Sequence, residues 1–405
     1  MTFIRNKVFI IASLTLISSR ILVYILDINL FGISYGFHLL DKNLLQNDLF
    51  KSLYYLHSQP IGWNLFAGIL TKLFNGNIGH INNFFEIYQL FLTHSILYIV
   101  LLICKEINSK SIFQYLISIF IIFNPSILFW EKIFSYQHTV CALIVLISYF
   151  IIKLFNTKKG IYEIYVYILL LLLSLIWSAF QPVLILVIFF IFRFLKIKIE
   201  IKNIIYFIVI ILLSSIPFIK NKIVFNTFTV GSWAGHQLST TFLDWKEVCD
   251  LPRPEDINSN ESINDLKMYE KNYNRKFNHP SLIGESSKYN FVGIIYRSQN
   301  CLKLTINRII ENPKEYLVGR AYAFLASHGK FAFDVLYPKP VGWNKYYYTL
   351  DKLYSNSKIK LLRQIMIFIY MMIVYFYLLN LIFFSKESVD LKKSYFVILI
   401  IYFYI

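Results

Sequence analysis

Charged residues are scarce in this sequence of 405 amino acids, and acidic residues are the scarcer kind. Only 16% of the residues are charged, against about 25% in soluble domains, while 57% are hydrophobic. The 23 acidic residues face 40 basic ones, which gives a net charge of +17. So little charge is not typical of a soluble protein of this length. The basic residues cluster between apolar runs, where membrane orientation accounts for them, so we expect no nucleic acid partner.

Cysteine is also rare, with four residues in the chain. Cys104 and Cys141 lie in or beside apolar runs, whereas Cys249 and Cys301 lie in a long polar segment. A disulfide between the latter two and a pair of separate thiols are both open, because the sequence does not give their distance. No spacing of His, Cys and Asp residues is diagnostic of a metal site. Dependence on a divalent metal therefore stays open, and no cofactor is predicted.

Apolar residues gather into runs of membrane-spanning length, which predicts an all-α integral membrane protein. The first run follows a basic start and has no small-residue cleavage site, so we expect an uncleaved helix and no signal peptide. The last run is too short to cross a membrane, so we expect the C-terminal helices to be incomplete. The runs cover residues 8–26, 60–74, 84–104, 112–130, 135–155, 162–180, 182–195, 203–219, 361–384 and 394–405.

The basic residues between the runs predict the topology. Arg5 and Lys7 place the N-terminus in the cytoplasm. The run 60–74 then decides the rest, because its 15 residues make a helix of about 22 Å against about 30 Å of hydrocarbon. We expect it to lie at or dip into the outer face without crossing. Every later basic cluster then falls on the cytoplasmic side.

This topology divides the chain into three parts. Residues 1–219 form an N-terminal transmembrane module with outer loops at 27–83 and 131–135, residues 220–360 form a mostly helical extracytoplasmic domain, and residues 361–405 form the C-terminal helices. In the outer domain we expect helices over 262–277 and 293–310. Asn312-Pro313 is typical of the start of another helix, running to about Ser327. We expect a multi-pass protein of the bacterial inner membrane.

Polar residues at membrane depth gather on the outer side in this topology. An ionisable side chain within a span is costly, so each is a candidate functional residue, although a cap, a surface pair or a turn is the plainer role. Asp41 and Asp48 lie seven residues apart, which places them on one face of a helix. The others are Arg20, His57, Gln59, Glu86, Glu131, Gln137, His138, Gln181, Lys220, Asn221 and His236.

These residue types suit glycosyl transfer from a lipid phosphate. The reaction needs a carboxylate base for the acceptor hydroxyl, for which Asp41 and Asp48 are candidates, and cations for the departing phosphate. Arg20 and Lys220 are candidates for those cations. One base with the leaving group in line predicts inversion at the sugar carbon.

The stretch HLLDKNLLQNDLFKSLYYLHSQPIGWNLF resembles the first outer loop of GT-C-type membrane glycosyltransferases, the superfamily of protein O-mannosyltransferases and aminoarabinose transferases. NPSILFWEKIFSYQ resembles their second outer loop, and IPFIKNKIVFNTFTVGSWAG and IIENPKEYL resemble parts of their outer domain. The resemblance covers most of residues 1–330. It implies a GT-C-like multi-helix bundle with juxtamembrane helices in the first outer loop, a polyprenyl-phosphate-linked sugar as donor, and a glycan, lipid or protein as acceptor.

By that resemblance, Asp41 is the better match for the base, and Glu131 is the second-loop acid that supports metal, acceptor or lipid phosphate. His57, Gln59, His138, Lys220 and His236 are then candidates for binding substrate or lipid phosphate, together with Arg20. The sequence departs from the family pattern in having Ile61 where a second proline is common and Gln181 where some relatives have histidine.

Two other functions stay open. A polysaccharide polymerase or ligase also handles lipid-linked sugars at the outer face, and it usually relies on outer-loop arginines. The arginines that keep this alternative open are Arg253, Arg275, Arg297, Arg308 and Arg320. A lipid-linked sugar transporter predicts paired half-repeats with broken helices at mid-membrane, and no such repeat is visible.

Overall fold

A computed structural model describes residues 7–25, 39–123, 125–178, 181–195, 200–233, 238–239, 249, 260–283 and 285–320. This part of the chain is helical, and no strand occurs among these residues. The helices predicted over 361–384 and 394–405 lie outside the described residues, as does His236.

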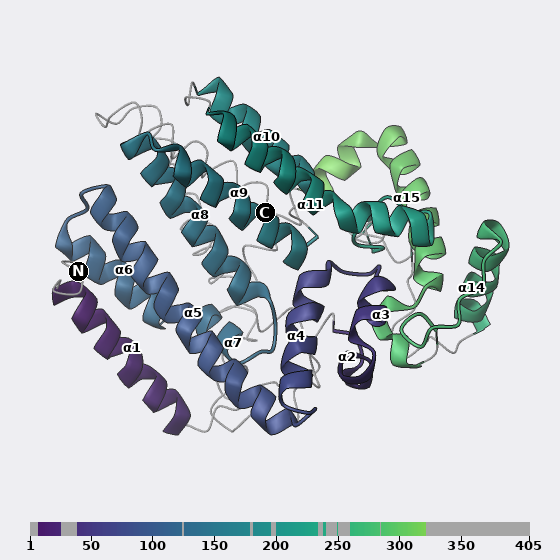
Figure 1. The fold of residues 1–405 in the computed structure, drawn as a ribbon, viewed down its shortest axis with the longest axis horizontal. Helices are drawn as coiled ribbons and strands as arrows, with labels where there is room; N and C mark the ends of the chain where they lie inside the picture. The colour runs from purple at the N-terminus through teal and green to yellow at the C-terminus, as the bar shows by residue number, and fades with distance from the viewer. Residues whose placement is uncertain are drawn as a thin grey trace.

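Within the described ranges, four helices are long and apolar enough to cross a membrane. They are α1 (Lys7–Ile25), α5 (Ile78–Glu106), α8 (Gln137–Thr157) and α11 (Ile201–Phe225). Three shorter apolar helices accompany them, namely α6 (Ser111–Phe123), α9 (Gly160–Ile176) and α10 (Pro182–Phe194). In Figure 1 these helices lie side by side, with α5 against α8, α8 against α9, and α9 against α11.

The predicted first outer loop, described here over residues 39–77, folds into three short helices. In Figure 1 they lie between this bundle and the described residues after α11, which we call the outer segment because they were predicted to lie outside the membrane. The three short helices are α2 (Lys42–Asn47), α3 (Leu49–Tyr54) and α4 (Ile61–Leu73), and α4 packs against α2, α3, α5 and α9. With 13 residues, α4 is about 20 Å long, and it is not among the four helices that reach spanning length. The outer segment contains α14 (Asn260–Tyr273), the 3₁₀ helix η3 (Glu285–Asn290) and α15 (Gly293–Glu311), and residues 313–320 are helical as well.

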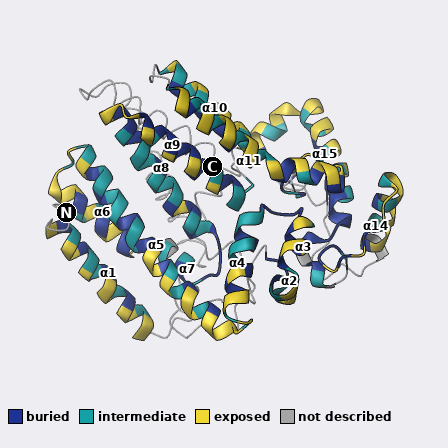
Figure 2. Ribbon diagram, viewed as in Figure 1, coloured by how far each residue is buried: buried dark blue, intermediate teal, exposed yellow. Residues whose placement is uncertain are grey.

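The first loop belongs to the hydrophobic core of the bundle. Leu45, Leu49 and Leu56 are buried in the same cluster as Ile147 of α8 and Leu173 of α9. The outward faces of the long helices carry exposed apolar residues, shown in yellow in Figure 2. Leu14 on α1, for example, is 60% exposed. Apolar side chains on both the inner and outer faces are what a helix needs when its surroundings are lipid.

Two predicted helix boundaries are wrong. The run 112–130 is two helices, α6 and α7 (Pro125–Glu131), because Pro125 has no amide hydrogen and its ring disfavours continuing the helix. The run 203–219 is part of a longer helix, because α11 continues through Pro217 to Phe225 and ends at Asn226, with a φ of 50°. Lys220, predicted to follow the helix, therefore lies inside it.

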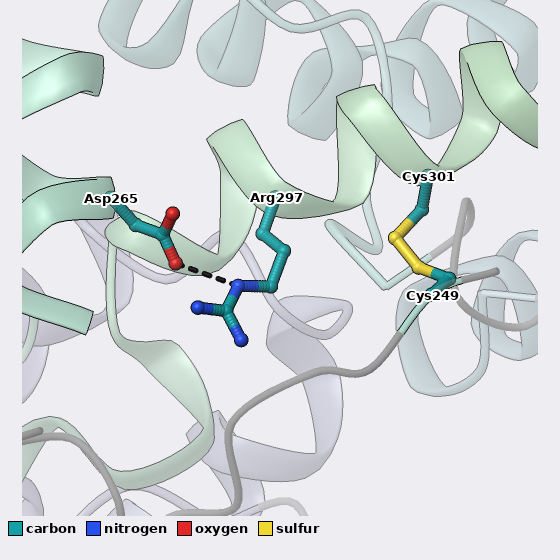
Figure 3. Close-up of a disulfide and its surroundings, with 4 residues drawn as sticks. All are labelled: Cys249, Asp265, Arg297 and Cys301. Carbon is teal, nitrogen blue, oxygen red and sulfur yellow. Dashed lines mark hydrogen bonds and ion pairs between the residues drawn. A yellow bond between two sulfur atoms is a disulfide. The ribbon is translucent and has the colours of Figure 1, made fainter. Parts of the chain in front are cut away.

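A disulfide and an ion pair hold the outer segment together (Figure 3). Of the two alternatives left by the sequence, the structure has the disulfide: Cys249 is bonded to Cys301 of α15, with their Cα atoms 5.5 Å apart. An ion pair between Arg297 Nε of α15 and Asp265 Oδ2 of α14, at 2.7 Å, fixes the two helices to each other. Tyr269 belongs to a small hydrophobic core that the outer segment shares with Val224 and Phe225 of α11.

Candidate active site

Helix α2 carries a carboxylate at each end. Asp41 is its N-cap residue, and Asp41 Oδ1 accepts a hydrogen bond from the amide of Asn43 at 2.9 Å. Asp48 is its C-cap residue. Both are half-buried. The segment is held against α4, because the amide of Leu40 donates to Asn64 Oδ1 at 2.8 Å. The loop that carries Asp41 and Asp48 is therefore held in place against α4.

The expectation that the two carboxylates share one helical face is wrong. Asp48 has a φ of −137° and a ψ of 46°, so the chain turns there between α2 and α3. The turn separates the environments of the two carboxylates. Asp41 caps its own helix, whereas Asp48 reaches the outer segment.

Asp48 is bonded to a histidine that lies 231 positions later in the sequence. His279 Nε2 lies 3.0 Å from Asp48 Oδ2, and His279 Nδ1 accepts a hydrogen bond from the amide of Ser281 at 3.2 Å. Because Nδ1 is an acceptor, the proton is on Nε2, and the ring donates it to the carboxylate. Ser281 Oγ also lies 2.6 Å from Nδ1, but Ser281 is fully buried and belongs to the turn. Asp48, His279 and Ser281 therefore stabilise a turn, and the buried Ser281 hydroxyl is not available as a nucleophile.

His57, predicted to bind substrate, joins the first loop to the outer segment in this structure. Its side chain is fully buried, with Nδ1 2.9 Å from Ser232 Oγ and Nε2 2.8 Å from the carbonyl oxygen of Asn290. A carbonyl only accepts, so Nε2 carries the proton. Burial and the nearby Lys220 cation lower the pKa of His57 to about 3, against an opposing hydrogen bond to Asn290. The ring is thus neutral at physiological pH.

Asn290 organises the turn around His57. Its Oδ1 accepts hydrogen bonds from the amides of His57 at 2.9 Å and Ser58 at 3.2 Å. Its Nδ2 donates to the carbonyls of Tyr55 at 3.1 Å and Ser281 at 2.8 Å. Asn290 is 2% exposed. The sequence analysis missed this residue, and nothing in the sequence around it distinguishes it from the other asparagines of the chain.

Lys220 also contacts the first loop. Its Nζ donates a hydrogen bond to the carbonyl of Leu56 and lies 5.8 Å from the centre of the Phe225 ring. The ammonium group thus ties α11 to the end of the first loop. Its predicted role toward a lipid phosphate stays a prediction. In that role, the ammonium group would release the carbonyl of Leu56 and donate a hydrogen bond to a phosphate oxygen instead.

A second cluster lies inside the helix bundle. Arg20 of α1 donates from Nε to Glu131 Oε2 at 2.8 Å and from Nη2 to Glu131 Oε1 at 2.6 Å. Arg20 Nη1 donates to the carbonyl of Ile122 at 2.6 Å and to Ser19 Oγ at 3.0 Å. Arg20 is 8% exposed and Glu131 is 4% exposed. The carboxylate therefore neutralises the guanidinium that was predicted to bind phosphate.

The same cluster extends to His138. Thr93 Oγ1 of α5 donates to Glu131 Oε1 at 2.5 Å and lies 2.9 Å from His138 Nε2 of α8. Since the Thr93 hydroxyl donates to the carboxylate, it accepts from His138. Four helices, α1, α5, α7 and α8, thus share one buried polar network, and it unites three predicted residues, namely Arg20, Glu131 and His138.

A further buried ion pair was missed by the sequence analysis. Glu163 of α9 is fully buried and pairs with Arg193 near the end of α10. Its Oε1 accepts from the Tyr167 hydroxyl at 2.6 Å, and its Oε2 accepts from Asn203 Nδ2 of α11 at 2.6 Å. An acidic residue at the edge of an apolar run is the signal that could have found Glu163, whereas Arg193 was predicted only to mark the cytoplasmic side. The pair joins α9, α10 and α11.

Gln59 is 8% exposed and lies in the turn that precedes α4. His236 lies outside the described residues. Among the described residues, no group of three or more His, Cys, Asp and Glu side chains is arranged to hold a metal ion.

The class that this fold defines is a helical membrane protein with four candidate spanning helices. Comparison with known proteins adds no narrower identity. No family model, no curated protein and no solved structure matches the chain.

Proposed function

We propose that this protein is a membrane glycosyltransferase of the GT-C type, which moves a sugar from a polyprenyl-phosphate-linked donor to an acceptor hydroxyl at the extracytoplasmic face. The observation that carries the proposal is the placement of Asp41 and Asp48 at the two ends of α2, on a loop packed between an apolar bundle and a polar outer segment. A lipid-linked sugar needs this combination, because its chain lies in the membrane and its reacting carbon lies at the surface.

Asp41 is the proposed general base. The acceptor oxygen attacks the anomeric carbon while its proton passes to the Asp41 carboxylate. The bond from that carbon to the phosphate oxygen breaks, and polyprenyl phosphate leaves with the bonding electrons, so the configuration inverts. Asp41 uses Oδ1 as the helix cap, and its half-buried position is compatible with access by an acceptor. Asp48, to which His279 donates, is the weaker candidate, because the resemblance to GT-C-type enzymes favours Asp41 as the base.

Lys220 is the proposed contact for the leaving phosphate. It lies in the last third of α11, and its ammonium group donates a hydrogen bond to the carbonyl of Leu56 in the first loop. Arg20 and Glu131 act, in this proposal, as a neutral pair that fixes α1 and α7 around the site. The acceptor class, whether glycan, lipid or protein, is not specified by these contacts.

The polymerase or ligase alternative gains no support from three of its five arginines, and Arg253 lies outside the described residues. Arg297 pairs with Asp265, and Arg308 Nη2 pairs with Glu315 Oε1 at 2.7 Å. Arg320 Nε lies 3.0 Å from the Tyr316 hydroxyl. These arginines stabilise local helix contacts, which is their ordinary role on a protein surface.

Asp41→Asn is the test of the proposed base. Asparagine caps a helix as well as aspartate does, so a purely structural Asp41 predicts an active variant. A catalytic base predicts a loss of about 10²- to 10⁴-fold in the transfer rate. The full-length protein in lipid nanodiscs would be supplied with polyprenyl-phosphate-linked hexoses and pentoses, and with hydroxyl acceptors of each class. The product would be measured by mass spectrometry.

Glu311→Gln is the matched control, because Glu311 is an exposed carboxylate at the end of α15. It is expected to leave the rate unchanged. Wild-type rates in Asp41→Asn would reject the base assignment. Absence of transfer with every donor, together with movement of the lipid-linked sugar across vesicles, would favour the transporter instead.

A further inference from the structure

A small cavity lies where the first loop, α11 and the outer segment meet. Its volume is about 130 Å³, which holds several water molecules or one small ligand group. The C-terminal residues of α3, the last turn of α11 and the turn after α14 form its walls. The residues that line it are Tyr54, Tyr55, Val224, Arg275, Lys276, Phe277, Asn278, His279 and Leu282.

The charge of this cavity has one sign. Arg275 and Lys276 are cationic, and none of the nine described residues that line it is acidic. Two carboxylates lie nearby, but both are engaged by other groups: Asp48 by His279 at 3.0 Å, and Glu270 by the amide of Phe277 at 3.0 Å. The charged side chains that line the cavity are therefore cationic, and the hydrogen bonds of both neighbouring carboxylates go to groups other than Arg275 and Lys276.

Arg275 is fixed in place by the end of α11. Its Nη1 donates to the carbonyls of Ile223, at 3.3 Å, and Val224. The last carbonyls of a helix carry partial negative charge, which would repel an anion, and Arg275 covers two of them. Both bonds use Nη1, and within the described part of the chain Nε and Nη2 donate no hydrogen bond. Those two nitrogens therefore remain to donate to a ligand.

Lys276 is exposed and makes no ion pair or hydrogen bond among the residues that the structure describes. The opposite wall is rigid by comparison. The His279 ring lies 4.8 Å from the Tyr55 ring, and both of its nitrogens are bonded to Asp48 and Ser281. The cavity thus combines an aromatic wall and a guanidinium that are held by hydrogen bonds with one exposed ammonium group.

We propose that this cavity is a binding site for a phosphate-type oxyanion, held by Arg275 through Nε and Nη2 and by Lys276. Paired nitrogen donors of a guanidinium match two oxygens of a phosphate, and a lysine adds a point charge that adapts to the ligand. The site lies beside the last turn of α11, a candidate spanning helix. That level suits a lipid headgroup phosphate, and free phosphate offers the same chemistry. The site is independent of the proposed base Asp41.

The test uses the full-length protein in maltoside detergent, which contains no phosphate. Isothermal titration with inorganic phosphate probes the free anion, and native mass spectrometry after addition of phosphatidylglycerol probes the headgroup. Lys276→Gln is expected to weaken binding of whichever ligand the site takes by about fivefold, because it removes one exposed cation. Lys276→Arg is expected to restore it. Lys271→Gln, an exposed lysine of α14 outside the cavity, is the matched control.

Saturable binding of inorganic phosphate that Lys276→Gln weakens and Lys271→Gln does not supports a site for the free anion. The same pattern with phosphatidylglycerol alone supports a headgroup site. If neither ligand saturates, or if the two lysine variants weaken binding equally, the proposal is wrong. Arg275 is left unchanged in these variants because it also covers the end of α11.

Discussion

Arg20 and Glu131 form a doubly hydrogen-bonded ion pair, buried at both ends, between residues 111 positions apart in the sequence. The pair joins α1 to α7 inside an otherwise apolar bundle. Each charge was costly to bury, and each is stabilised by the other. The pair therefore fixes α1 relative to α7, and its removal should have a measurable effect on stability.

Breaking the pair from one side should destabilise the protein strongly. Arg20→Met leaves the Glu131 carboxylate buried without its guanidinium, and we expect a loss of about 3–5 kcal/mol in the free energy of unfolding. Glu131→Leu should cost a similar amount. The double variant should be more stable than either single variant, because two apolar residues replace two matched charges. Denaturation in detergent, followed by circular dichroism, measures all three.

Lys132→Gln is the control for this cycle. Lys132 pairs with Glu86 at 2.9 Å, with side chains 19% and 35% exposed. A pair this exposed contributes about 0–1 kcal/mol. Strictly additive effects of Arg20→Met and Glu131→Leu would contradict the coupling that the geometry indicates.

Gly62 lies at the closest approach of α4 to α9. A Cβ atom at this position would lie 2.6 Å from the carbonyl oxygen of Leu175, which belongs to the backbone and has little freedom to move. We expect Gly62→Ala to cost about 1–3 kcal/mol of stability. Gly79→Ala is the control, because its nearest new contact is the Asn77 side chain at 3.4 Å. Equal melting temperatures for the two variants would show that α4 does not pack on α9 in this way.

His57 makes stability depend on pH. Its pKa is about 3 in the folded protein and 6.5 as an ordinary histidine, so between those values the unfolded chain binds a proton that the folded chain does not. Stability from this group is fully present above about pH 6.5 and falls by about 1.4 kcal/mol for each pH unit below it, down to about pH 3. Unfolding in detergent at pH 7.5, 6.5, 5.5 and 4.5 measures the slope.

His57→Gln separates this histidine from the other titrating groups. The glutamine amide can still donate to the carbonyl of Asn290, but it does not titrate. The variant should lose stability at pH 7.5 and show a flatter dependence below pH 6.5. Parallel curves for the two proteins would mean that His57 is not buried as a neutral ring.

The disulfide should stabilise the outer segment. Cys249 and Cys301 close a loop with a sequence separation of 52, for which chain entropy predicts about 4 kcal/mol. Reduction with dithiothreitol, or Cys301→Ser, is expected to lower the melting temperature. Cys141→Ser is the control, because Cys141 is a free thiol on α8. Unchanged melting after reduction, with the thiols shown to be free by maleimide labelling, would contradict this role.

The long helices were predictable because their evidence is local. The apolar runs 135–155, 162–180 and 182–195 match α8, α9 and α10 within four residues, and the run 84–104 lies inside α5, which begins six residues earlier. The two errors share a cause, since proline has no single effect. Pro125 separates two helices, whereas Pro217 is accommodated inside α11. Contacts with neighbouring helices decide whether a proline ends a helix or is accommodated within it. A short stretch of sequence does not specify those contacts.

The site was less predictable because its partners are distant. Asp48 meets His279, and His57 meets Asn290, and no periodicity links positions so far apart. The sequence placed Arg20 and Glu131 among the candidates, since charge in an apolar run is unusual. It did not show that they would neutralise each other. Their pairing depends on how α1 and α7 pack against each other in the folded protein.

The anchoring of the first loop has a consequence for how the protein is made. His57 and Asn290, the residues that close the loop against the outer segment, are separated by 233 positions. At about 5–20 residues per second, a ribosome needs roughly 10 to 50 s to synthesise the chain between them. During that interval the acidic loop has left the ribosome without the side chain that holds it. A nascent chain shorter than about 290 residues therefore lacks the Asn290 side chain that closes its first loop, and the loop takes its final form only after that residue has been synthesised.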